Sequence, residues 1–65
     1  RLYEAISSLP PMQARRVHAR YMLGMKVKDI AAMDGITPSQ AGKSIHAALR
    51  RLRRYFARQK WTVNL

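Results

Sequence analysis

Apolar residues recur at spacings of three and four along most of the chain, and short breaks divide this pattern into four segments. The breaks fall at Pro10 and Pro11, at Gly24, and at Asp34 and Gly35. Such spacings place side chains on one face of a helix, whereas the alternation typical of strands is absent. We therefore predict an all-α fold: a small four-helix domain over residues 1–65, with helices at about 2–8, 11–23, 27–33 and 37–59 and a loose or docking tail at 61–65.

The apolar positions of these segments define the expected core. Leu2, Ile6 and Leu9 form one stripe on the first helix, and Val17 and Tyr21 face inward from the second. The four methionines are expected to fill core gaps, because their side chains are flexible. The other expected inner positions are Met12, Ala14, Val27, Ile30, Ala31, Met33, Ile36, Ala41, Ile45, Ala48, Leu52, Tyr55 and Phe56.

The stretch 27–45 has the pattern of a helix-turn-helix. A short helix is followed by Gly35, which tolerates the left-handed conformation that a tight turn requires. The longer helix has a strong start signal, because Thr37 and Gln40 are spaced as in a capping box and Pro38 suits the first helical position. These features predict two helices that cross at a steep angle.

The predicted long helix carries polar and basic side chains opposite its apolar stripe. A helix with such a face can enter the major groove of DNA, where residues near its N-terminus meet the base edges. We expect Ser39, Gln40 and Lys43 to read bases, because an amide pairs with adenine and an ammonium group with guanine. Phosphate contacts, which position the protein without reading sequence, are expected from His46, Arg50, Arg51 and Arg54.

The charge of the chain indicates a polyanionic partner. Thirteen Lys and Arg oppose three Asp and Glu, so the formal net charge is +10 and the pI is about 11.5. Nucleic acid is the first candidate for such a partner. An anionic membrane surface is the second, although no apolar run is long enough to span a bilayer. A solvated basic face without a partner is the third interpretation.

Catalytic and metal chemistry have little to draw on in this sequence. There is no cysteine, and the two histidines, His18 and His46, are far apart. With only three acids, these residues assemble neither a nucleophile–base pair nor a set of metal ligands. We therefore expect no enzyme activity, no cofactor, no metal and no small-molecule substrate.

The motifs together resemble region 4 of sigma-70-family RNA polymerase sigma factors, in particular the small, extracytoplasmic-function type. The resemblance runs from about Leu2 to Arg54 and implies a last helix that reads the upstream (−35) promoter element and a domain that docks on the flap of the polymerase β subunit. It also implies that Ala47 faces the bases and that Thr37 and Ser44 face the phosphates. The motifs that carry it are Leu9-Pro-Pro-Met-Gln13, Arg20-Tyr21, Gly24, Asp29-Ile-Ala31, Gly35-Ile-Thr37 and the arginine-rich helix.

Several positions depart from the pattern of that family. Arg16 and His18 stand where apolar residues are usual, and Asp34 replaces an apolar residue before the turn glycine. Arginine, which many members carry, is missing at Ser44 and Ala47. The base-reading set is therefore unusual, and the target sequence does not follow from the resemblance.

Two functions remain open. The first is sequence-specific binding of double-stranded DNA in transcription initiation, with RNA polymerase as a second partner. The second is a protein-interaction module of a sigma-like regulator from a phage or mobile element, in which the basic helix binds polymerase or another acidic partner. Either would act in the cytoplasm, at the nucleoid. Because the chain begins with Arg1 rather than Met, we expect a fragment or processed product of a longer protein.

Overall fold

The computed structural model describes residues 2–58, without the side chains of residues 2 and 3. The elements are α1 (Leu2–Ser7), α2 (Pro11–Val17), the π-helical turn η1 (His18–Met22), α3 (Val27–Asp34) and α4 (Pro38–Arg58). Within residues 2–58 there is no strand, which confirms the all-α prediction. The predicted tail, the predicted helix end at residue 59 and the expected core position Leu2 lie outside what the structure describes.

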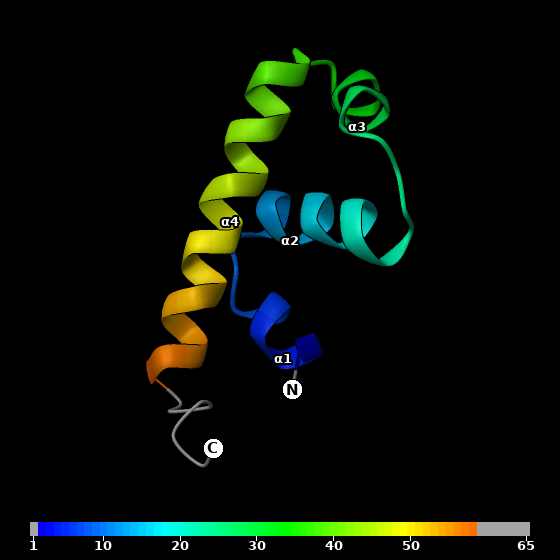
Figure 1. Ribbon diagram of the computed structural model, residues 1–65. Helices are drawn as coiled ribbons and strands as arrows, with labels where there is room; N and C mark the ends of the chain where they lie inside the picture. The colour runs from blue at the N-terminus through cyan, green and yellow to red at the C-terminus, as the bar shows by residue number, and fades with distance from the viewer. Residues whose placement is uncertain (1, 59–65) are drawn as a thin grey trace.

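Every other helix packs against α4, which forms one side of the molecule (Figure 1). It has 21 residues, and a helix of that length extends about 31 Å. In Figure 1, α2 begins beside the middle of α4 and runs away from it, and α3 lies beside the N-terminal end of α4. Helix α1 lies below α2, toward the C-terminal half of α4. The first turns of α4 are therefore held by the preceding helix of the helix-turn-helix, and the later turns by α1 and α2.

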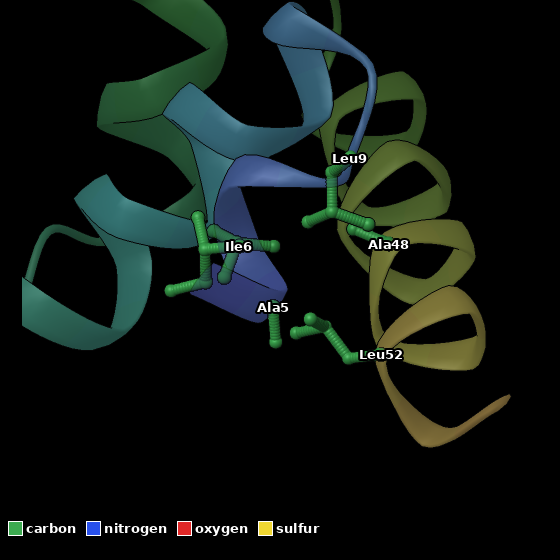
Figure 2. Close-up of a cluster of buried hydrophobic side chains, with 6 residues drawn as sticks. Ala5, Ile6, Leu9, Ala48 and Leu52 are labelled. Carbon is green, nitrogen blue, oxygen red and sulfur yellow. The ribbon is translucent and has the colours of Figure 1, made fainter. Parts of the chain in front are cut away.

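The core consists of two clusters that meet at Leu49 of α4, which packs against both. Figure 2 shows the larger cluster, in which residues of α1 and the following turn face Ala48 and Leu52 of α4. Ala5 and Ala48 are fully buried, and their small side chains let the backbones approach closely. The members of this first cluster are Ala5, Ile6, Leu9, Val17, Ala48 and Leu52. The second cluster joins Ala19, Ile30 and Ile45 at the helix-turn-helix.

Most predicted inner positions are confirmed, including Ile30, Ala31 and Ala41. Four predictions are wrong, because Met12, Tyr21, Met22 and Met33 are about half exposed or more. The reason is the shortness of α2, η1 and α3, since each buries only one narrow strip. On α3 that strip runs through Ile30 and Ala31, which leaves Met33 on the solvent side.

The second predicted helix, at 11–23, is not one regular α-helix. The α-helical part ends at Val17, and the chain continues as η1, in which the Leu23 amide donates to the His18 carbonyl at 3.1 Å. Gly24 then adopts a left-handed φ of 71°, as expected for a residue that follows a helix end. Three helix bounds also differ from the prediction by one residue: α1 ends at Ser7, α3 ends at Asp34 and α4 begins at Pro38.

Candidate nucleic-acid interface

The turn between α3 and α4 has the geometry that the sequence predicts. Gly35 has a φ of 68°, a left-handed conformation, and the Ile36 amide donates to the Ala31 carbonyl at 3.0 Å. The backbone N–H of Gln40 donates to the Thr37 hydroxyl at 3.1 Å, and the backbone N–H of Thr37 donates to the side-chain carbonyl of Gln40 at 3.0 Å. The capping box is therefore confirmed, and it fixes where α4 begins.

One exposed strip of α4 brings together four of the predicted site residues. Ser39, Lys43, His46 and Arg50 follow at intervals of four, three and four residues, which places them on one face of the helix. With Gly42 they line an open hollow of about 540 Å³. The opposite face of α4 is buried through Ala41, Ile45, Ala48 and Leu52, so packing against the domain determines which face is exposed.

Gln40 is exposed, but its side chain already has a partner inside the protein. Its carbonyl oxygen accepts the Thr37 amide of the capping box. Bidentate recognition of adenine uses both the carbonyl and the amide of a glutamine. The capping box uses one of the two lone pairs of this carbonyl oxygen and directs it toward the Thr37 backbone, so bidentate pairing with adenine would require the carbonyl to serve both partners.

The predicted phosphate contacts fall into two groups on α4. His46 and Arg50 lie on the strip with Lys43, whereas Arg51 and Arg54 line a second hollow of about 390 Å³. The second hollow lies against the turn after α1, because Ser8 and Leu9 complete it together with Tyr55 and Arg58. The structure therefore does not bring all the arginines to one place.

The three remaining site residues differ in exposure. Thr37 is exposed, and Ala47 and Ser44 are half-buried. The Ser44 hydroxyl accepts a hydrogen bond from the Arg16 guanidinium at 3.0 Å, so it faces α2.

Comparison with known families decides which of the fold's many uses applies here. The family model described as Sigma-70, region 4 matches residues 1–52, which include the helix-turn-helix and the exposed strip. The chain belongs to the sigma-70 region 4 family. No curated protein and no solved structure matches it.

Membership confirms the resemblance inferred from the motifs. Sigma-70 region 4 is a DNA-binding domain of transcription initiation and not a catalytic family. This domain is therefore a DNA-binding helix-turn-helix of a sigma-type transcription factor. The match ends at Leu52, so the last turns of α4, with Arg54 and Arg58, lie beyond it.

An ionic cluster in this region 4 domain was missed by the sequence interpretation. Asp34 accepts hydrogen bonds from Arg15 and from Arg16, each at 2.7 Å. The Asp34 side chain is only 2% exposed, and the hydrogen bond from Arg16 holds the pKa of its carboxyl below the ordinary value against the opposing effect of burial. The available signal was the pair of departures already noted, since Arg16 and Asp34 put opposite charges at positions where apolar residues are usual.

Among the described residues of the region 4 domain, no group of three or more His, Cys, Asp or Glu side chains could hold a metal ion. No helix within residues 2–58 is both long and apolar enough to cross a membrane.

Proposed function

We propose that this region 4 domain reads the −35 promoter element by placing the first half of α4 in the major groove. The observation that carries the proposal is the exposed strip of Ser39, Lys43 and Arg50 on a helix whose opposite face is buried. Ser39 and Lys43 would contact base edges, Gln40 would donate from its amide, and Ala47 would meet an apolar part of a base. The domain would act at the nucleoid, in the cytoplasm.

Phosphate contacts would surround this reading face. His46 and Arg50 lie along the strip itself, while Arg51 and Arg54 are displaced to the neighbouring side of α4. The phosphate backbones run along both edges of the major groove, so a basic strip and a second basic side suit a helix between them. The hydroxyl of Thr37, at the N-terminus of α4, is exposed and can donate to a phosphate.

A selection of bound duplexes from a random pool, at near-physiological salt, tests this proposal. We expect one short motif to be enriched. Lys43→Ala should change or relax the preferred sequence, whereas Arg54→Ala should weaken binding to all duplexes alike and lower the salt dependence by about one phosphate contact. Lys28→Ala, which removes one charge from α3, is the matched control and should leave the preferred sequence unchanged.

The outcomes of this selection separate the candidate functions. Binding without enrichment would contradict base reading and leave a contact driven by charge. The absence of binding, or an affinity insensitive to salt, would contradict the DNA proposal and favour the protein-interaction module.

A separate surface supports docking on RNA polymerase, on the flap of the β subunit. Tyr21 and Met22 are about half exposed, and both line an apolar hollow of about 200 Å³ between α1, α2, η1 and α4. The two exposed apolar side chains beside this hollow would offer a contact surface to a protein partner. The remaining lining residues are Ile6, Val17, Leu49 and Leu52.

Binding of the purified β flap distinguishes this surface from the basic helix. If the apolar hollow docks, Met22→Lys should weaken flap binding and leave DNA binding intact, because Met22 lies outside the exposed strip of α4. If instead the basic helix is the protein contact, Arg50→Ala and Arg51→Ala should abolish flap binding without affecting DNA. The second result would support the protein-interaction module.

A further inference from the structure

Four polar side chains from three helices meet beside the helix-turn-helix. Arg15 and Arg16 come from α2, Asp34 is the last residue of α3, and Ser44 lies in the second turn of α4. Arg15 Nη2 donates to Asp34 Oδ1 at 2.7 Å, and Arg16 Nε donates to Asp34 Oδ2 at 2.7 Å. Arg16 Nη1 donates to Ser44 Oγ at 3.0 Å. A single guanidinium group therefore joins both helices of the helix-turn-helix.

The position of this cluster in the chain relates it to the recognition helix. Asp34 directly precedes Gly35, the left-handed residue of the turn. Ser44 directly follows Lys43 and stands one helical turn after Gln40. Arg16 thus contacts the polypeptide on both sides of the turn, immediately next to the residues that face the groove.

The Arg16–Asp34 part of the cluster is enclosed by the protein, whereas Arg15 reaches it from the surface. The side chains of Asp34 and Arg16 are 2% and 12% exposed, whereas that of Arg15 is 51% exposed. Charges this enclosed contribute little net stability, because their desolvation offsets their attraction. A planar guanidinium with two partners instead constrains their relative geometry, because each N–H group must point toward its acceptor.

The backbone hydrogen bonds of the turn and the capping box fix where α4 begins, but the side chains that pack α3 against α4 are apolar. On the inner side, α3 and α4 meet through Ile30 and Ile45, which pack with Ala19. Apolar contacts are non-directional, so they hold the helices together without specifying one rotation. The hydrogen bonds of Arg16, on the outer side, specify the rotation of α4 relative to α3.

We propose that Arg16, Asp34 and Ser44 are positioning residues that set the orientation of α4 relative to α3, and thereby the sequence specificity of DNA binding. The inference rests on the proposed function of α4 as the helix that reads bases. It gives Ser44 a role inside the protein, in place of the phosphate contact expected from the family pattern. The residues act through Lys43 and its neighbours and do not touch DNA themselves.

The test is the ratio of affinities for two duplexes, one carrying the selected motif and one a scrambled sequence of the same length. Fluorescence anisotropy gives both affinities at one salt concentration, and circular dichroism verifies that each variant is folded. Asp34→Asn should lower this ratio by about fivefold, which is the lower end of what one base contact contributes. Asp29→Asn is the matched control: it removes the same charge from an exposed position of α3 and should leave the ratio unchanged.

Ser44 provides a variant that folds in any case, because alanine is a better helix former than serine. Ser44→Ala should lower the ratio, and Ser44→Thr, which keeps the hydroxyl, should preserve it. If Ser44→Ala weakens binding to both duplexes equally, Ser44 is a direct phosphate contact and the inference is overturned.

Failure of the inference and failure of the proposed function give different results. Equal ratios in the unaltered chain, Asp34→Asn and Ser44→Ala overturn the inference alone. If the unaltered chain binds neither duplex, or binds both alike, base reading fails and the inference fails with it.

Discussion

The helix-turn-helix depends on Ile30, whose truncation should have a large and calculable effect on stability. Ile30 is 1% exposed and is the largest fully buried side chain of the described residues. Ile30→Ala removes about three CH₂ equivalents, which costs about 2.4 kcal/mol of unfolding free energy at about 0.8 kcal/mol each. An unfilled cavity adds to this cost, so we expect a loss of about 2.4 to 4 kcal/mol.

That loss is large for a chain of 65 residues, whose total stability should be about 3 to 10 kcal/mol. Urea unfolding followed by far-UV circular dichroism measures the loss, provided that the slope of the unfolding free energy against urea concentration is the same in both proteins. At the lower limit of this total stability, Ile30→Ala leaves little or no folded protein. Ile30→Val therefore provides a milder step, with an expected loss of about 0.5 to 1.5 kcal/mol.

Met33 supplies the comparison within the same helix. It is 59% exposed, so Met33→Ala should change the unfolding free energy by no more than about 0.5 kcal/mol. A loss in Met33→Ala as large as in Ile30→Ala, or no loss in Ile30→Val, would refute the assignment of the second cluster as the support of the helix-turn-helix.

Two further predictions concern the backbone and pH. Gly42→Ala should raise the unfolding free energy by about 1 kcal/mol, because Gly42 lies inside α4 and an added Cβ meets nothing within 4 Å. Gly35→Ala should instead lower the unfolding free energy by about 1 to 2 kcal/mol through the left-handed backbone alone, since the space for a Cβ is equally open there. Equal effects of the two substitutions in urea unfolding would contradict this prediction. The pKa of Asp34 is lowered in the folded protein by the hydrogen bond from Arg16 and by the charges of Arg15 and Arg16. The contribution of Asp34 to stability is therefore present above the unfolded pKa of about 3.9 and is lost as pH falls through the folded pKa. Unfolding free energies of the unaltered chain and Asp34→Asn should therefore approach each other as pH falls from about 4 through the folded pKa, and a constant difference across that range would contradict the assignment.

Local signals in the sequence predicted most of the fold. Glycine at the turn, the Thr37–Gln40 capping box and the apolar stripe of α4 each act over a few residues, so they can be recognised without knowing the fold. The π-helical turn and the exposure of Tyr21 and Met33 depend on which helix faces are covered. That depends on how the helices pack, which composition and spacing do not specify.

The candidate site was predicted in the same uneven way. The spacing of Ser39, Lys43 and Arg50 places them on one face, because helical geometry alone fixes their angles. The pairing of Arg16 with Asp34 and Ser44 was not predicted, since it joins three helices and requires their relative placement. The capping function of the Gln40 side chain was predicted, but its consequence for base recognition becomes clear only from the hydrogen bond that directs the carbonyl oxygen toward the Thr37 backbone.

The division of the core into two clusters has a consequence for how the chain opens. Leu49 is the one partly buried side chain that packs against both clusters among the described residues. Cooperative unfolding units generally coincide with such contiguous packed groups. We therefore expect the α3–α4 junction and the part held by α1 to open as partly separate units, joined by Leu49, by the continuous α4 backbone and by the Arg16 hydrogen bonds, so that amide exchange at the junction can differ from that beside α1.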